Sequence, residues 1–509
     1  MSPITRRDLL RHAALSLPAL TVLPGLATAQ TQAPPAAPPA APAPASSPVP
    51  QGSRPPQKVI VVGAGLAGLA AAYELSNLGD DVTVLEAQLR PGGRVWTMRG
   101  VFSDGLYAEA GAINFGDGYR HLVRYAKSFN LPYASMSPPS RPLSQVCFVR
   151  GKRLEPDDKG AMAWPFQLTE EEKGLDVFGL FRKLFRPIAQ EIGDPTDPAF
   201  QVTKFERFDN MTFAEYLKSQ GVSEEAIALL SSNFGFGYGW EDGSALHRMI
   251  SDIALFYAGQ GTARFFEGGS DRLPYAFAAA LRERIHYGAP VHKISQDKDK
   301  VRAVYRQGGE DRRIEADRLI CTVPVPVLRK IDIAPGLSPK KREVVEKLQY
   351  APVTRIYVQT DRRFWADEGH FGGACTDLPI QFVTEHPFLR AADQQRGILE
   401  CHIKGEQALK VDAMSPDQRL DFAVDNLEKI HPGFRRHFEG GTSVSWTADP
   451  WALGGYPWWK PGQLTAWMPE LGRAEGRIHF AGEHTSALGR TLEGALESGN
   501  RAAREVRGA

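Results

Sequence analysis

Three glycines spaced as G-x-G-x-x-G are the first residues in the chain whose types and spacing point to chemistry: Gly63, Gly65 and Gly68. A glycine at the first position permits a tight turn, and one at the second lets the backbone approach a pyrophosphate. A glycine at the third lets a helix pack closely on a strand. The N–H groups at the start of that helix would then point at the phosphates. The pattern therefore predicts a loop that binds the phosphates of a nucleotide.

The elements that must position this loop are a strand, a helix and a second strand, in that order. Lys58 to Val62 is a short β-branched run typical of a buried parallel strand, and Leu69 to Leu78 favours a helix. A second strand, Asp81 to Leu85, ends in Glu86, an acid placed to accept a ribose hydroxyl. Together these parts predict a dinucleotide-binding unit. This unit alone does not separate NAD from FAD.

Two further motifs separate the cofactors by resemblance. Residues 90–94, RPGGR, resemble the RxGGR element of FAD-dependent amine oxidases, phytoene desaturases and their relatives. Residues 476–483, GRIHFAGE, and 492–499, LEGALESG, closely resemble the closing motif of the same family. The resemblance runs in order from Lys58 to Val506, so the chain is similar to flavin amine oxidases over nearly all of its folded length.

This resemblance implies FAD as the cofactor and assigns residues to it. Arg94 would meet the phosphates, Glu483 would hold the ribityl chain, and the last helix would point its N-terminus at the flavin ring. Val291 would lie on the strand against the adenine. The cofactor-binding residues expected are Gly63, Gly65, Gly68, Glu86, Arg94, Val291, Gly482, Glu483 and Leu492.

The fold implied is α/β, with a Rossmann-like FAD-binding domain built from separated segments, a mixed-sheet substrate domain and a helical insertion. The FAD-binding segments expected are 57–115, 263–330 and 466–509, the substrate segments 116–151 and 331–465, and the insertion 152–262. Apolar residues at helical spacing within Leu168 to Ile192 and Thr212 to Phe234 independently predict a helical insertion.

The N-terminus predicts export. Residues 5–10, TRRDLL, are typical of a twin-arginine signal, an apolar stretch follows from His12 to Leu26, and Ala27-Thr28-Ala29 is an A-x-A cleavage site. We therefore expect residues 1–29 to be a signal peptide and the Pro/Ala-rich residues 30–56 to be a disordered tether. A periplasmic or secreted protein follows from this interpretation.

Composition limits the partners. The chain of 509 residues has a formal net charge of +1 and 23% charged residues, so nothing favours a nucleic-acid partner. The apolar N-terminal stretch is too short for a stable membrane span. The four cysteines, Cys147, Cys321, Cys375 and Cys401, show no metal-ligand spacing, so no metal is expected. Disulfides and a homodimer are left open.

The aromatic segment from Trp446 to Trp459 aligns with the family segment that runs along the flavin face. Tyr456 falls on one wall of the aromatic cage that orients the amine, and Trp458 and Trp459 would shape the site beside it. Gly455 stands where monoamine oxidases carry a flavin-bonding cysteine, so the FAD should be non-covalent. The opposite cage wall is Thr491, where many relatives have tyrosine or tryptophan.

Arg355 is a departure that concerns chemistry. It stands in the strand 353–358, where relatives usually carry a lysine that holds a water against the flavin and assists reaction with oxygen. A guanidinium keeps the charge but does not deprotonate and is larger and planar. Arg355 could hold that water, bind an anionic substrate group, or be a solvated strand arginine. The electron acceptor is therefore either O2 or a periplasmic electron carrier.

Another departure from the family pattern concerns amino acids as substrates. L-amino acid oxidases resemble the chain around residues 108–112 and 376–379, but they carry an arginine and a tyrosine that hold the substrate carboxylate. The corresponding residues here are Asn114 and Thr384, which we expect to face the substrate. Unless Arg120 or Arg355 substitutes, an amino acid would bring an unpaired carboxylate into an apolar site.

The function predicted is FAD-dependent oxidation of a C–N bond in a primary or secondary amine, with Arg355 and Tyr456 as catalytic residues. The imine would hydrolyse to a carbonyl compound, and O2, giving H2O2, or a carrier would take the electrons. The alternatives are an L-amino acid oxidase with a relocated carboxylate anchor, a FAD-dependent lipid or carotenoid isomerase or desaturase, and a non-catalytic FAD-bound protein.

Overall fold

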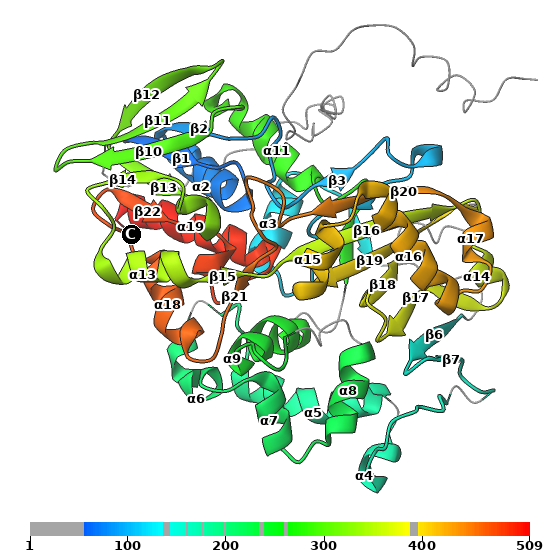
Figure 1. The fold of residues 1–509 in the computed structure, drawn as a ribbon. Helices are drawn as coiled ribbons and strands as arrows, with labels where there is room; N and C mark the ends of the chain where they lie inside the picture. Colours follow the sequence, from blue (N-terminus) through cyan, green and yellow to red (C-terminus); the bar gives the residue numbers. More distant parts are fainter. Residues whose placement is uncertain are drawn as a thin grey trace, which may run out of the picture. The chain divides into compact units, whose positions relative to one another are not determined.

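The computed structural model describes residues 55–508 except for several short segments. Those segments are 136–142, 159–160, 176, 198, 234–238, 259–262 and 387–394. The predicted signal at 1–29, and the predicted tether at 30–56 except its last two residues, lie outside the described residues. The described residues lie in one compact unit, and every element below belongs to it (Figure 1).

A five-stranded parallel sheet carries the glycine loop, in the strand order β22-β13-β1-β2-β9. Its strands are β1 (Lys58–Val62), β2 (Asp81–Leu85), β9 (Ile285–His286), β13 (Arg318–Cys321) and β22 (Ile478–Phe480). The bounds of β1 and β2 confirm the predicted ones, because their buried β-branched residues suit a sheet that is covered on both faces. Three separated parts of the chain therefore build this sheet, as the resemblance implied.

Two helices from opposite ends of the chain pack against each other beside this sheet (Figure 1). Helix α2 (Leu66–Asn77) follows the glycine loop, and α19 (Leu492–Arg507) closes the fold. A Cβ at Gly499 would lie 2.2 Å from the carbonyl oxygen of Ala67, so only glycine permits the contact. Helix α2 begins three residues earlier than predicted, with Gly65 as its N-cap.

A four-stranded sheet is formed by strands between residues 291 and 334, most of them in the second predicted FAD-binding segment. Its order is β12-β11-β10-β14, with β10 (Val291–Gln296), β11 (Val301–Gln307), β12 (Glu310–Ala316) and β14 (Asp332–Ala334). The first three strands form an antiparallel meander, and β14 pairs with β10 in parallel. This sheet therefore continues a few residues past the segment boundary predicted at 330.

A seven-stranded mixed sheet forms the second large layer, in the order β20-β16-β19-β18-β17-β6-β7. Its strands are β6 (Ser144–Val149), β7 (Lys152–Leu154), β16 (Val353–Thr360), β17 (His370–Thr376), β18 (Phe382–Glu385), β19 (Gly397–Lys404) and β20 (Phe438–Ser445). Helices α15 (Glu406–Asp412) and α16 (Pro416–Ile430) pack on it (Figure 1). All eight residues of β16 are buried, and the strand is paired on both sides, with β19 and β20, so it lies inside the sheet.

The helical insertion is divided more finely than predicted. It contains α4 (Glu170–Lys173), α5 (Val177–Ile192), α6 (Glu206–Asp209), α7 (Phe213–Ser219), α8 (Glu224–Asn233), α9 (Ala245–Arg248), the π-helical turn η3 (Met249–Ala254) and α10 (Leu255–Ala258). The capping box of Thr169 starts α4 as a helix of its own, and Gly221, at φ +79°, separates α7 from α8. The helical character predicted within 168–192 and 212–234 is therefore confirmed for the described residues, and each range holds two helices, α4 and α5 in the first and α7 and α8 in the second. Phe234 lies outside the described residues.

One disulfide joins two neighbouring strands of the mixed sheet. Cys147 on β6 and Cys375 on β17 lie opposite each other in the parallel pair and are bonded, whereas Cys321 and Cys401 are buried free thiols. Within the described ranges, no helix is long and apolar enough to cross a membrane, and no group of three or more His, Cys, Asp or Glu residues could hold a metal.

Candidate active site

A cavity of about 330 Å³ lies at the carboxyl ends of the parallel strands β1, β2, β13 and β22. This is the edge where open α/β sheets bind their ligands, and sites for small molecules usually measure about 300–1,000 Å³. Eight of the nine predicted cofactor residues line it: Gly63, Gly65, Glu86, Arg94, Val291, Gly482, Glu483 and Leu492. The ninth, Gly68, packs behind the loop.

The three glycines of the loop have the backbone geometry and the close contacts that the sequence pattern predicts for them. Gly63 adopts φ +103°, a left-handed conformation that other residues rarely take. A Cβ at Gly68 would lie 2.0 Å from the carbonyl oxygen of Gly63, so the helix packs there on bare backbone. A Cβ at Gly65 would meet nothing within 4 Å, and Gly65 lines the cavity. The open space beside Gly65 is where a pyrophosphate would approach the N-terminus of α2.

Glu86 closes the loop from the end of β2. Its carboxylate accepts the backbone N–H of Ala64 at 2.5 Å and that of Gln88 at 2.8 Å. Burial raises the pKa of Glu86, and the two N–H donors oppose that shift. The acid is therefore fixed against the glycine loop, with its side chain at the cavity wall where a ribose would lie.

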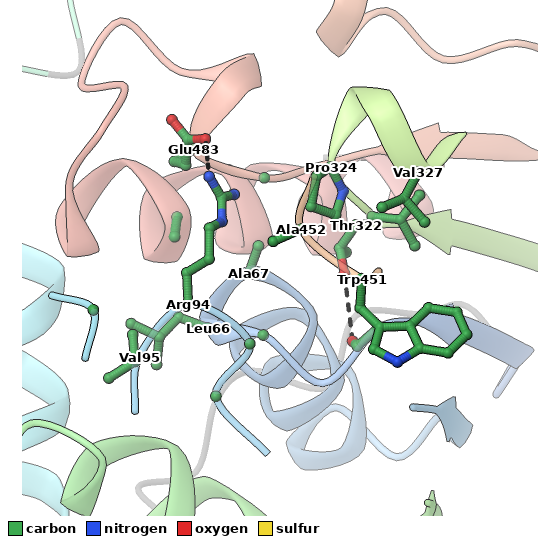
Figure 2. Close-up of a pocket in the computed structure, with 18 of the residues that line it drawn as sticks. Leu66, Ala67, Arg94, Val95, Thr322, Pro324, Val327, Trp451, Ala452 and Glu483 are labelled. Atoms are coloured by element: carbon green, nitrogen blue, oxygen red, sulfur yellow. Dashed lines mark hydrogen bonds and ion pairs between the residues drawn. The ribbon is translucent and has the colours of Figure 1, made fainter. Parts of the chain in front are cut away.

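Arg94 and Glu483 join the two ends of the chain across the cavity (Figure 2). Arg94 Nη1 donates to Glu483 Oε1 at 2.9 Å and to the carbonyl oxygen of Gly455 at 2.7 Å. The second carboxylate oxygen of Glu483 accepts the backbone N–H of Arg490 at 2.8 Å. Arg94 thus ties the loop after β2 to the C-terminal motif by an ion pair and to the aromatic segment by a hydrogen bond.

The lining fits FAD. It offers two helix N-termini, an open glycine turn, an arginine and two acids, which match the phosphates and hydroxyls of a dinucleotide. None of the residues described as lining the cavity is a cysteine.

The cavity also reaches three of the residues predicted for the substrate side: Arg355, Tyr456 and Thr491. The hydroxyl of Tyr456 is buried and has no hydrogen-bond partner among the described residues. Thr491 is the N-cap of α19: its hydroxyl accepts the N–H of Gly494 at 2.9 Å and donates to the carbonyl of Leu488 at 2.6 Å. The hydroxyl of Thr491 is thus committed to the helix, and that of Tyr456 is uncommitted.

Arg355 is a buried residue, so it is not a solvated strand arginine; only 8% of it is exposed. Its Nη1 donates to the carbonyl oxygens of Glu109 at 3.1 Å and Gly111 at 2.7 Å, and its Nε lies 3.4 Å from Glu400 Oε1. Gly111 lines the cavity. Arg355 therefore holds a wall segment in place as well as facing the cavity.

Four other predicted substrate residues lie elsewhere. Asn114 is exposed, and Thr384 lies on β18 opposite Glu400, outside the cavity lining. Trp458 and Trp459 are buried: Trp458 belongs to the hydrophobic cluster against which Tyr456 packs, and Trp459 belongs to another core cluster. The structure therefore brings Arg355, Tyr456 and Thr491 together and leaves these four outside the lining.

Sequence reasoning missed a charged group at this end of the cavity. Arg490 lines the cavity and is paired with Asp252 of the insertion, which also pairs with Arg248. His402, opposite Arg355 on β19, also lines it. The sequence signal that could have pointed to this group is Arg248 and Asp252, two opposite charges at i, i+4 spacing inside an otherwise apolar stretch. Charged residues in such a stretch are rarely buried without a function or a partner.

A second cavity of about 500 Å³ lies between α7, α8 and the strands β17 to β19. His402 lines both cavities, so the two meet at this residue. Lys404, two residues further along β19, lines the second cavity only.

Comparison with known proteins covers nearly the whole chain. The model of the family described as flavin containing amine oxidoreductase matches residues 66–507. The chain is 32% identical over 467 residues to the Bacillus subtilis strain 168 protein named "Putative L-amino-acid oxidase YobN", covering 89% of this chain and 95% of that one. It is 30% identical over 466 residues to the L-amino-acid oxidase of Gloydius blomhoffii, with 89% of each chain covered.

Solved structures share the fold at lower identity. Putrescine oxidase, bound to putrescine, superposes with a TM-score of 0.74 at 22% identity, covering 89% of this chain and all of that one. Cyclohexylamine oxidase from Brevibacterium oxydans IH-35A gives 0.73 at 23% identity, covering 89% and 99%. These similarities confirm the α/β fold predicted from sequence.

Proposed function

This chain belongs to the family of flavin-containing amine oxidoreductases, and from that premise we propose that it oxidises the C–N bond of an amino-bearing substrate with non-covalent FAD. The substrate loses a hydride and a proton and becomes an imine. Water then converts the imine to a carbonyl compound and releases ammonia or an amine. O2, which becomes H2O2, or an electron carrier takes the two electrons.

The observation that carries this proposal is one cavity that runs from the glycine loop to Tyr456. The cofactor residues line one part of it, and Arg355, Tyr456 and Arg490 line the other. When bound, FAD supplies a ring that accepts hydride from the carbon next to a neutral amine nitrogen. The lining places the substrate-side residues in continuity with the cofactor residues, as such a transfer requires.

The chain's own residues orient the substrate and exclude water. Tyr456 forms an aromatic wall of the cavity and packs against the hydrophobic cluster that contains the buried Trp458. Arg355 donates to the carbonyl oxygens of Glu109 and Gly111 and so holds in place the segment through which Gly111 lines the cavity. A rigid, largely apolar site favours a neutral amine over an ammonium ion, because burying an unpaired charge is costly.

Two features of the chain support the finer parts of the proposal. The lack of cysteine among the described lining residues supports non-covalent FAD. The Cys147–Cys375 disulfide supports export through the predicted twin-arginine signal, because disulfides persist in oxidising compartments.

The proposal is tested by mixing the purified yellow protein with amines and matching L-amino acids without oxygen, and following the visible flavin band. Bleaching by any of these donors supports C–N oxidation, and admitting air then tests O2 as the acceptor. Free FAD at the same concentration, which should not bleach, is the control. A holoprotein that no amine or amino acid bleaches contradicts the proposal.

A further inference from the structure

Arg490 is held so that its side chain faces the cavity. Its backbone adopts φ +68°, a left-handed conformation that residues other than glycine rarely take. Its backbone N–H donates to Glu483, which anchors this conformation to the cofactor end of the cavity. Such strain persists only where the surroundings enforce it, and it concentrates at functional sites.

The charge of Arg490 is only partly neutralised. Its Nη1 contacts both oxygens of Asp252, at 3.0 and 3.3 Å, and Arg248 contacts the same carboxylate at 2.8 Å. Two guanidinium groups therefore share one carboxylate, which leaves one positive charge in this group. The Nε of Arg490 is buried and has no hydrogen-bond partner among the described residues.

Aromatic rings fix both guanidinium groups. Arg490 lies over the ring of Tyr456 at 4.5 Å, and Arg248 lies over that of Trp458 at 5.0 Å. Stacking occupies the faces of a guanidinium and leaves its edges, which carry the N–H donors, for a planar anion. Arg490 is thus oriented to meet a carboxylate edge-on, and Tyr456 fixes that orientation.

Burial and the positive charge of Arg490 and its neighbours lower the pKa values of two nearby basic groups, Lys404 and His402. Burial, followed by the charges of Arg490 and Arg248, lowers the pKa of Lys404 to about 7. Burial and the charges of Arg355, Lys404 and Arg490 lower the pKa of His402 well below its usual value. An ammonium ion would be repelled here, whereas an anion would be attracted.

The two arginines considered from sequence are less suitable. Arg120 is 55% exposed and pairs with Asp194 at 2.5 Å, and it does not line the cavity. Arg355 already donates to two carbonyl oxygens and lies against Glu400. Arg490 and Arg355 both line the cavity, and each has a buried Nε without a hydrogen-bond partner among the described residues. Arg490 differs in that it shares its one carboxylate with Arg248, which leaves an excess of positive charge.

We propose that Arg490, stacked on Tyr456 and braced by Asp252 and Arg248, binds a carboxylate of the substrate. The inference rests on the proposed function and narrows its substrate class to amines that carry a carboxylate. The carboxylate compensates the excess positive charge, and the amino group stays neutral beside it. The anchor lies between the two parts of the C-terminal motif, next to Thr491, and not at the positions of Asn114 or Thr384.

The first test measures binding without turnover. The FAD-loaded protein is titrated with benzoate, an unreactive carboxylate, and with benzamide, its uncharged counterpart, while the visible flavin band is followed. Arg490→Met should raise the Kd for benzoate about 10- to 100-fold, the loss expected for a hydrogen bond to a charged group, and leave that for benzamide nearly unchanged. An unaltered Kd for benzoate in Arg490→Met overturns the inference.

Two further variants separate recognition from structural damage. Asp252→Asn removes the negative charge that competes for Arg490 but keeps a side-chain oxygen that can accept from it and hold it in place. This variant should bind benzoate more tightly than wild type; equal or weaker binding contradicts the inference even if Arg490→Met fails to load FAD. Arg120→Met is the matched control, an exposed arginine of another Arg–Asp pair, and should bind benzoate as wild type does.

Substrate pairs then test the class. The ratio of kcat/KM for L-phenylalanine to that for 2-phenylethylamine should fall at least about 10-fold in Arg490→Met, mainly through KM. Benzoate binding through Arg490 without any flavin bleaching would contradict the proposed function alone. Bleaching by donors, with benzoate binding indifferent to Arg490, would overturn the carboxylate anchor alone.

Discussion

The two ends of the cavity are built in different ways. At the cofactor end, backbone makes the site: glycines at fixed spacing, a helix N-terminus and strand ends, with Glu86 bonded to backbone N–H groups. At the substrate end, side chains make the site: Arg355 from β16 and Arg490 from the loop before α19 line the cavity, and Asp252 from the insertion pairs with Arg490. A site made of backbone follows from a local pattern, whereas a site made of side chains depends on tertiary packing.

The largest expected effect tests the backbone end. Gly65→Leu places a side chain in the space where the pyrophosphate would lie, and the turn cannot yield because Glu86 and Gly92 are bonded to it. Overpacking costs about 1–3 kcal/mol even where neighbours yield. The variant should therefore purify without yellow colour, which absorbance and released FAD measure.

Gly440→Leu is the matched control for this substitution. Gly440 also has nothing within 4 Å of its added Cβ and no left-handed φ, but it lies on β20, outside the cavity lining. It should keep its FAD. A fully yellow Gly65→Leu protein would contradict the assignment of the loop.

The next effect concerns the substrate sheet. Replacing Cys147 and Cys375 by serine removes a cross-link between residues 228 apart in sequence, which should lower the free energy of unfolding by about 2–5 kcal/mol. Neither cysteine lines the cavity, so the flavin spectrum and the Kd for benzoate should stay as in wild type. Denaturant unfolding measures the loss. Dithiothreitol should destabilise wild type to a similar extent and the double variant not at all; equal sensitivity of both proteins would contradict the cross-link.

Sequence located the cofactor end almost residue by residue. The strands from Lys58 to Val62 and Asp81 to Leu85 have their predicted bounds, and eight of the nine predicted cofactor residues line the cavity. Each of these positions lies in a strand, a turn or the start of a helix, and short sequence motifs predict such elements. The helix after the loop begins three residues early only because Gly65 is itself the N-cap.

The substrate end could be predicted only in part. Arg355 and Tyr456 line the cavity, as their places in the family's strand before the Phe-Trp pair and in its aromatic segment implied. Asn114 and Thr384 do not line it. They were chosen by alignment with the carboxylate-binding residues of relatives, and alignment does not determine where the side chains lie in the fold of this chain. Arg490 could not be placed from sequence, because its left-handed φ and its partner in the insertion arise only in the folded chain.

A smaller, pH-dependent effect concerns Lys404 on β19. Burial, with the charges of Arg490 and Arg248, lowers the pKa of Lys404 from 10.5 to about 7. Below pH 7 the lysine is charged in both states, so the folded state bears the full cost of the buried charge. Between pH 7 and 10.5 the unfolded chain binds more protons, so that cost fades as pH rises.

Lys404→Met should therefore be more stable than wild type at pH 6, within the range of about 0.5–3 kcal/mol for single substitutions, and the advantage should close by about pH 10.5. Thermal unfolding across this pH range measures it. Lys218→Met, at the exposed edge of the same second cavity, is the control and should show no such advantage. A stability difference that does not change with pH would contradict the depressed pKa of Lys404.

The smallest effect comes from Thr491, where the two ends of the cavity meet. Its hydroxyl caps α19, the helix whose first residues line the cofactor cavity. The side chain of Thr491 therefore binds the helix backbone, although the sequence predicted that it would face the substrate. Thr491→Ala should cost about 0.5–2 kcal/mol of stability, the usual loss of an N-cap, and Thr491→Ser should restore most of it. Because serine keeps the hydroxyl and alanine does not, chemical denaturation of this pair isolates the cap. The preference for L-phenylalanine over 2-phenylethylamine should be the same in both variants. If that preference changes with the hydroxyl while stability does not, Thr491 belongs to the side-chain end of the cavity and not to the backbone end.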